Sequence, residues 1–196
     1  LAAQGVDLSR VATHDGSTRF LVEKLLARPR VLPEIRALIP DAARCHLVPY
    51  TTSALERDLA LTLGIPLYGA DPELLPFGTK TGCRRLFAEA GVQHPIGYED
   101  VRDVGGMVDA LARMREAKPA VTDAIVKLND GVAGRGNAVV ELRDLPAPGP
   151  DHERAALPSR LEALAFDDAR VQLSSYLAEF AQDGGIVGER VVGLEL

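Results

Sequence analysis

The sequence feature that most constrains this chain is a glycine-rich loop between two short apolar segments. Residues 125–128 and 138–142 are rich in β-branched and apolar side chains, which is typical of strands. The loop between them contains Gly131, Gly134 and Gly136. Glycine adopts positive φ angles and lets a ligand approach the backbone closely. We therefore predict a strand–loop–strand unit whose loop can contact a ligand through backbone groups.

The connections of this loop exclude two common nucleotide-binding motifs. A Walker phosphate loop needs G-x-x-x-x-G-K-[ST] before a helix, and the string at residues 78–81 does not fit it. A dinucleotide-binding turn also leads from a strand into a helix, whereas this loop leads from strand to strand. We predict a hairpin flap whose N–H groups close over phosphates, with Lys127 supplying a positive charge. The alternative is an ordinary glycine-rich hairpin with an exposed lysine.

Composition narrows the class of protein. The chain has 196 residues, 46% apolar and 26% charged, which suits a globular protein with one large or two small domains. A net charge of −6 argues against a general nucleic-acid binder, and no apolar run is long enough for a membrane span. Cys45 and Cys83 form neither a disulfide framework nor a zinc site, and no signal-peptide pattern is visible, so we expect a cytoplasmic setting. The start at Leu1 and the end inside an apparent strand suggest a piece of a longer protein.

The first part of the chain is predicted to be helical and then to form a strand–helix–strand unit. Residues 17–39 show helical periodicity, interrupted at Pro29. Residues 45–50 and 65–68 are predicted strands, and a capping box at residues 53–56 opens a helix between them. This order favours a parallel pair of strands, so a small α/β layer is expected.

The second part is predicted to mix helices with strands. Helices are expected over residues 79–90, 104–114 and 174–181, a short strand over 94–98, the hairpin described above, and a further strand from residue 184. Residues 144–159 contain four prolines and are predicted to be a loop. The predicted fold class is α/β, of the α+β kind, with one domain over residues 1–77 and a second over 78–196.

Positive charge at the start of the helix over residues 79–90 is a further signal. Lys80, Arg84 and Arg85 lie in its first two turns with no acidic residue. A cation near a helix N-terminus opposes the helix dipole by about 0.3–1 kcal/mol, and a bound anion would remove that conflict. For Arg84 and Arg85 the preferred interpretation is a solvated basic face.

Four strings carry a resemblance to a known family. They are Leu47-Val-Pro49, Leu67-Tyr-Gly69, Gly78-Thr-Lys-Thr81 and Val126-Lys-Leu-Asn129. In this order they resemble the ATP-grasp superfamily of carboxylate–amine ligases, preceded by its pre-ATP-grasp domain. The most similar subgroup is that of peptide ligases like the one that builds pheganomycin. The resemblance covers most of residues 20–196. It implies a parallel α/β unit of the pre-ATP-grasp kind, followed by the N-terminal part of an ATP-grasp domain.

The resemblance implies a nucleotide site residue by residue. Lys80 and Lys127 match the two lysines that reach the ATP phosphates, and residues 131–137 match the flap over the triphosphate. Residues 190–191 fall on the linker that faces adenine, and Glu195 falls where a glutamate binds the ribose hydroxyls. The implied ATP-binding residues are Lys80, Lys127, Asn129, Gly131, Ala133, Gly134, Arg135, Gly136, Asn137, Arg190, Val191 and Glu195.

The resemblance also implies what this chain lacks. At the position of Gly188 the family often has an acidic residue, and that acidic residue contacts the adenine amino group. It holds Mg²⁺ with acidic residues and an Asn on later strands, so the metal ligands are expected beyond residue 196 and no catalytic residue is assigned here. Phosphoryl transfer between anions requires cations on the transferring group. Two lysines and a flap can bind nucleotide but cannot supply a metal site.

The chain is therefore interpreted as the nucleotide-binding part of an ATP-dependent peptide ligase. In the implied reaction ATP phosphorylates a carboxylate, and an amine attacks the acyl phosphate to give an amide. The flap should exclude water, because a hydrolysed acyl phosphate is wasted. Small-molecule or peptide carboxylates and amines are the implied partners, and neither nucleic acid nor a membrane is expected. The alternatives are a non-catalytic ATP- or ligand-binding module that regulates a partner, and a structural domain that binds no nucleotide.

Overall fold

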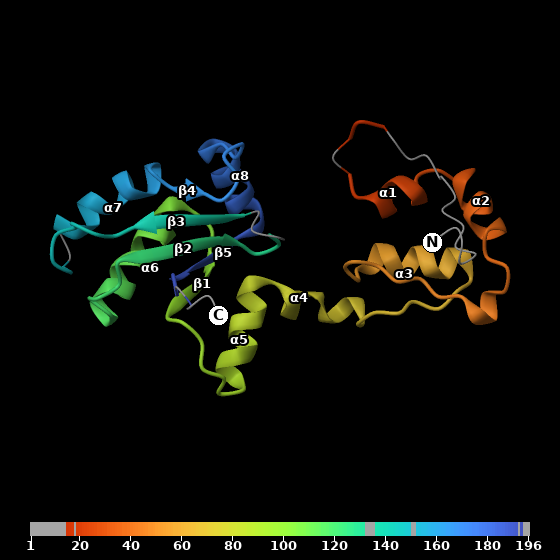
Figure 1. The fold of residues 1–196 in the computed structure, drawn as a ribbon, viewed down its shortest axis with the longest axis horizontal. Coiled ribbons are helices and arrows are strands. Elements are labelled where there is room, and N and C mark those ends of the chain that lie inside the picture. The colour runs from red at the N-terminus through yellow and green to blue at the C-terminus, as the bar shows by residue number, and fades with distance from the viewer. Residues whose placement is uncertain (1–14, 18, 132–135, 150–151, 192, 194–196) are drawn as a thin grey trace. The chain divides into compact units, whose positions relative to one another are not determined.

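The computed structural model describes residues 15–17, 19–131, 136–149, 152–191 and 193 (Figure 1). The chain divides into two compact units, Leu1–Leu75 and Pro76–Leu196. The first is mainly helical, and the second combines helices with an antiparallel sheet, so the fold class is α+β. Within the described ranges, no helix has both the length and the apolar content to cross a membrane.

The first unit is built on three α-helices that share one small apolar core. They are α1 (Leu21–Leu26), α2 (Val31–Ala37) and α3 (Ala54–Leu63), with short 3-10 turns at Ala42–Arg44 and Pro72–Leu74. The expected break in residues 17–39 is confirmed, since Pro29 lies between α1 and α2. Ser53 and Glu56 form the predicted capping box, and Gly64 ends α3 with a φ of 73°. Leu25, Leu59 and Leu63 are the buried centre of this core.

In the first unit, a single parallel bridge takes the place of the two predicted parallel strands. Leu47 pairs in parallel with Leu67: its N–H donates to the Pro66 carbonyl, and its own carbonyl accepts from the Tyr68 N–H, both at 2.8 Å. The two segments are therefore parallel neighbours, as expected, but they do not continue as strands. Pro49 and Pro66 lack N–H donors, which limits how far such a ladder can extend.

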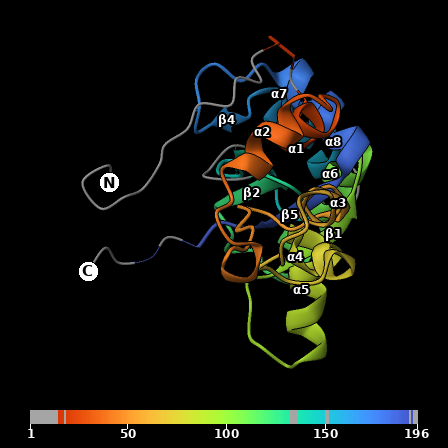
Figure 2. The same cartoon turned by 90° about the vertical axis from the view of Figure 1, so that its right-hand side faces the viewer.

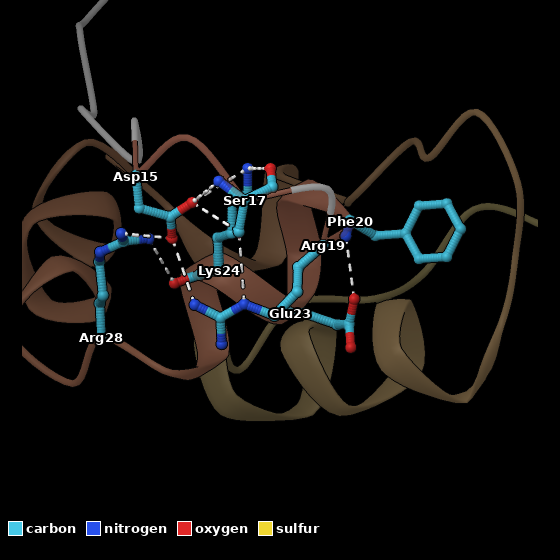
Figure 3. Close-up of polar contacts among 7 residues, drawn as sticks. All are labelled: Asp15, Ser17, Arg19, Phe20, Glu23, Lys24 and Arg28. Carbon is cyan, nitrogen blue, oxygen red and sulfur yellow. Dashed lines mark hydrogen bonds and ion pairs between the residues drawn. The ribbon is translucent and has the colours of Figure 1, made fainter.

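The Asp15 carboxylate pairs with three cations, one before α1, one on it and one after it (Figure 3). Its carboxylate forms ion pairs with Arg19, Lys24 and Arg28 at 2.8–3.2 Å. It also accepts from the backbone N–H of Ser17 at 3.0 Å and from its hydroxyl at 2.6 Å. Lys24 lies in the last turn of α1 and Arg28 follows the end of that helix, so a single carboxylate joins residues on both sides of the helix end.

The second unit carries a five-stranded antiparallel sheet with helices before and between its strands. The short helix α4 (Leu75–Gly78) spans the unit boundary. The strands are β1 (Gly97–Val101), β2 (Asp123–Leu128), β3 (Asn137–Glu141), β4 (Ala165–Phe166) and β5 (Gly185–Glu189), and the longer helices are α5 (Lys80–Glu89), α6 (Val104–Ala117), α7 (His152–Glu162) and α8 (Leu173–Asp183). The predicted helices, the hairpin and the strand after residue 184 are confirmed, with shifted ends.

The sheet order is β1-β5-β2-β3-β4, so the last strand of the described chain lies in the interior of the sheet. β2 is flanked by β3 and β5, and every pairing is antiparallel. The turn between β1 and α6 follows a bulge in β1, where Asp100 adopts a φ of 57°. The predicted antiparallel hairpin of the second unit is confirmed by the pairing of β2 with β3.

One face of this sheet packs on three helices, and the opposite side carries α5. The main core joins Met107 and Leu111 of α6, Leu157 of α7 and Phe180 of α8 to the strands. In both ribbon views, α7 and α8 lie at one end of the second unit and α5 at the other (Figures 1 and 2). On the face opposite the core, the side chains of Asp123, Ile125 and Lys127 of β2 are partly exposed.

The prediction of a loop over residues 144–159 is wrong in its second half, because α7 begins at His152 and contains Pro158. Two interactions outweigh the proline. Leu157 is fully buried, and Glu153 forms a buried ion pair with Arg115 of α6 at 2.5 Å. Arg115 also donates to the Pro146 carbonyl at 3.1 Å, which ties the proline-rich segment to the same helix.

Asp15 generates a test of pH-dependent stability. Hydrogen bonds from Ser17, supported by those from Arg28 and Lys24, hold the pKa of Asp15 below its ordinary value. A lowered pKa in the folded state stabilises the fold above an unfolded-state pKa of about 3.9, and this stabilisation is lost as the pH falls below that value. Asp15→Asn should therefore lower the melting temperature at neutral pH, and the difference from the wild type should shrink in acid. Circular-dichroism melts of both proteins across this pH range measure it.

Asp58→Asn is the matched control, because among the described residues the Asp58 carboxylate pairs with its neighbour Arg57 alone, and both side chains are about half exposed. Its effect at neutral pH should be much smaller. An Asp15→Asn difference that stays constant into acid would show that the carboxylate charge is not responsible.

Candidate functional site

Lys127 lies on the middle strand of the sheet and points away from the helical core. On β2, Ala124, Val126 and Leu128 are buried in that core. Side chains alternate along a strand, so Lys127 lies on the opposite face. It is half-buried, and no hydrogen bond or ion pair to its ammonium is found in the described part of the chain. The structure thus places a half-buried cation, without a partner among the described residues, on the face of the sheet opposite the helical core.

The neighbours of Lys127 on this face come from both adjacent strands. Asn137 of β3 lies directly opposite it, and Ile186 of β5 lies opposite on the other side. Residues directly opposite one another in an antiparallel pair share a face. The structure therefore brings together Lys127 and Asn137, which the resemblance assigned to the strand and the end of the flap.

Asn129 connects the end of β2 to the start of α5. Its backbone carbonyl accepts from the Lys80 N–H at 3.2 Å, and its side-chain Oδ1 accepts from the Thr81 N–H at 3.1 Å. Its backbone N–H donates to the Gly184 carbonyl at 3.1 Å, and its Nδ2 donates to the Asp183 carbonyl at 2.9 Å. Four hydrogen bonds thus join one residue to the N-terminus of α5 and to the segment between α8 and β5.

The N-terminus of α5 has no free donor for an anion. Thr79 caps the helix: its hydroxyl accepts from the Gly82 N–H, and its carbonyl accepts from the Cys83 N–H. Asn129 takes the two preceding N–H groups. An anion at this helix end would therefore have to bind the Lys80 ammonium, because the backbone N–H groups are already engaged. That ammonium donates to the Gly131 carbonyl at 3.2 Å, the residue where the flap begins.

The far end of the flap is fixed from the opposite face of the sheet. The Gly136 carbonyl accepts from the Leu128 N–H at 2.9 Å and from the Tyr176 hydroxyl of α8 at 3.1 Å. Burial, with a smaller contribution from the charge of Glu179, raises the pKa of the Tyr176 hydroxyl, so it remains a donor at neutral pH. No sequence signal pointed to Tyr176, because its partner is far away in the chain.

The residues matched to the adenine end lie at the other end of β2. The Arg190 N–H donates to the Asp123 carbonyl at 3.1 Å, and Val191 is 64% exposed. A hydrogen bond from Thr122, with Arg143 and Arg190 nearby, lowers the pKa of Asp123 and keeps it charged. Ala133, Gly134, Arg135 and Glu195 lie outside the described residues.

The prediction of a solvated basic face is wrong for Arg84 and holds in part for Arg85. Arg84 pairs with Glu99 at 2.5 Å and donates to the Pro95 carbonyl at 3.0 Å, with its side chain 11% exposed. Arg85 pairs with Asp100, although its side chain remains 60% exposed. The acids that balance α5 therefore come from β1, which follows the helix in the chain. Of the three basic residues at the start of α5, only Lys80 lacks a carboxylate partner among the described residues.

Two shallow hollows lie beside β1, and neither includes Lys127. One, of about 320 Å³, lies between β1 and α6 and is lined by Tyr98 and Arg113 among others. The second, of about 270 Å³, lies beside the first half of α5 and includes Thr81 and Asn129. No cluster of His, Cys, Asp or Glu side chains in the described part of the chain could hold a metal ion.

Gly136 provides a test of how tightly the flap is anchored. Its φ is +85°, and a Cβ there would meet Leu128 side-chain atoms at 3.0 Å. Gly136→Ala should lower the free energy of unfolding by the roughly 1 kcal/mol of positive φ plus a further cost from Leu128. Gly91→Ala is the control, since Gly91 has a φ of +67° and open space around its Cβ position. Urea unfolding of both variants measures the difference, and equal losses would contradict the contact with Leu128.

Comparisons with known proteins relate part of this unit to one superfamily. A family model described as IQCH-like, ATP-grasp matches residues 74–156. The chain is 32% identical over 134 residues to IQ motif-containing protein H from Danio rerio; the match covers 67% of this chain and 13% of that protein. D-alanyl-alanine synthetase A from Vibrio cholerae is a structural match with a TM-score of 0.45 and 12% identity, covering 76% of this chain and 38% of that one. The family-model match supports a relationship of this chain to the ATP-grasp superfamily.

Proposed function

We propose that the unit Pro76–Leu196 binds ATP on the face of its sheet opposite the helical core, with Lys80 and Lys127 holding the phosphates. The observation that carries the proposal is the Lys127 ammonium, which lies half-buried on the middle strand without a partner among the described residues. Placing a cation on an apolar surface is costly unless an anion compensates it. A polyphosphate is the anion that two converging lysines and a glycine flap would suit.

The connection through Asn129 supports a shared phosphate site. Asn129 follows Lys127 by two residues, which is about 7 Å along a strand. The same Asn129 holds the first residue of α5, Lys80, by its backbone N–H. The Lys80 ammonium contacts Gly131, where the flap starts. We therefore propose that both lysines reach the same phosphates, although 47 positions separate them in the sequence.

The proposed ligand would extend along β2 from the flap toward Arg190. Asp123, which accepts from the Arg190 N–H, lies four residues before Lys127, or about 13 Å along the strand. That length suits a molecule with phosphates at one end and a base at the other. Arg190, Val191 and Glu195 would serve the base and ribose. Residues 131–137, with Asn137 opposite Lys127, would cover the phosphates.

The finer proposal is that the parent protein is a carboxylate–amine ligase of the pheganomycin type, working through an acyl phosphate in the cytoplasm. It is supported by the order of the matched strings and by the relationship to the ATP-grasp superfamily. The residues described here do not fit a Mg²⁺ site, since they contain no suitable cluster of ligands. The lysines would orient and partly neutralise the triphosphate, and the metal ligands would come from sequence after residue 196.

A second candidate function is a non-catalytic nucleotide-binding module that regulates a partner. It is favoured by the family model, whose description is IQCH-like, and by the match to an IQ motif-containing protein. The two candidates share the ATP site and differ in turnover. Release of ADP and phosphate, dependent on added carboxylate and amine, would favour the ligase.

Removing either lysine tests the proposed ATP site. Lys80→Ala and Lys127→Ala should each weaken ATP binding by about 1.5–3 kcal/mol, the range for hydrogen bonds to charged groups. Adenosine binding should change much less, because adenosine has no phosphate. Isothermal titration of both ligands against the whole chain measures the two effects.

Lys118→Ala is the matched control, because Lys118 pairs with Glu189 outside the proposed phosphate site and is half exposed. It should leave ATP binding within about twofold of the wild type. Equal losses for ATP and adenosine in the Lys80 and Lys127 variants would show that these lysines support the fold and do not hold phosphate.

A further inference from the structure

Asn129 was grouped with the ATP-binding residues, but its polar atoms are already engaged within the protein. Oδ1 accepts from the Thr81 N–H at 3.1 Å, and Nδ2 donates to the Asp183 carbonyl at 2.9 Å. The backbone N–H and carbonyl of Asn129 are engaged as well. One hydrogen bond on each side-chain atom thus ties the amide to the protein, on two different elements.

We infer that Asn129 is a positioning residue. It holds Lys80 beside Gly131, the residue where the flap begins, and does not contact the nucleotide. The inference rests on the proposed ATP site and assigns this residue a role within it. Asn129 binds the first two N–H groups of α5, and Lys80 is the first residue of that helix. The orientation of the helix start, and so of the Lys80 side chain, therefore depends on Asn129.

The chemistry of the side chain suits this role. The two N–H groups at the start of a helix have no partner within the helix, so an acceptor from another element can fix where the helix begins. The Asn side chain supplies an acceptor on one side and a donor on the other. Asn129 uses the acceptor on α5 and the donor on the last carbonyl of α8, at Asp183. Asparagine thus bridges two helix ends, one through each side-chain atom.

The Lys80 ammonium has only a neutral partner among the described residues. It donates to the Gly131 carbonyl at 3.2 Å, and no carboxylate pairs with it there. Such a contact alone holds a long flexible side chain weakly. Loss of the Asn129 amide should therefore change where Lys80 lies, even though the backbone bonds of residue 129 remain.

The first measurement does not depend on ATP. Acetylation of the whole chain by an N-hydroxysuccinimide ester, followed by mass spectrometry, gives the modification rate of Lys80 relative to Lys118 in the same molecule. Asn129→Ala should raise this ratio about fivefold, the effect of losing one net hydrogen bond. Leu161→Ala, a core variant in α7, is the control for general destabilisation. It should leave the ratio unchanged. An unchanged ratio in Asn129→Ala would overturn the inference.

The second measurement is a double-mutant cycle on ATP affinity. Asn129→Ala should weaken ATP binding about fivefold in the wild type and should have no further effect in the Lys80→Ala background, because it acts through Lys80. Additive losses would overturn the inference, since they would mean direct contact with ATP or a general structural effect. If the wild type binds no ATP, the proposed function fails, and the acetylation ratio still decides whether Asn129 positions Lys80.

Discussion

The second unit depends on the antiparallel pairing of β2 with strands on both of its sides. This pairing satisfies the backbone groups of β2 and leaves its side chains to alternate between two environments. One set packs with α6, α7 and α8, where an error of one residue in register would bury Lys127 in the core. The burial of Ala124, Val126 and Leu128 therefore fixes which face carries the lysine. The position of the proposed site therefore follows from the strand register that the core requires.

Much of this unit could be predicted from local sequence. The β-branched and apolar segments on either side of the glycines predicted β2 and β3, and helical periodicity predicted most of α6. These predictions succeed because each pattern is short-range and each face is buried by the same core.

Two failures come from interactions between residues that are not neighbours in the sequence. Arg84 pairs with Glu99, and Glu153 pairs with Arg115, and neither pair is visible in a local pattern. Pro158 predicted a loop, yet burial of Leu157 and the Arg115–Glu153 pair stabilise a helix there. The same limit holds for the candidate site. The resemblance pointed to Lys80, Lys127 and Asn129, but the sequence did not show that Asn129 binds the start of α5.

The place of β5 has a consequence for how this unit can be made. β1 pairs only with β5 in the described sheet, and β5 lies between β1 and β2 although it follows both in the chain. A ribosome has therefore released β1, α6 and the whole hairpin before the strand that joins them is synthesised. Until residue 189 emerges, β1 has no partner and one edge of β2 is open, which is a template for pairing with another chain. Sheets closed by a late strand form slowly, because distant segments must meet first. The strands around Lys127 can thus form a single sheet only after β5 has been synthesised.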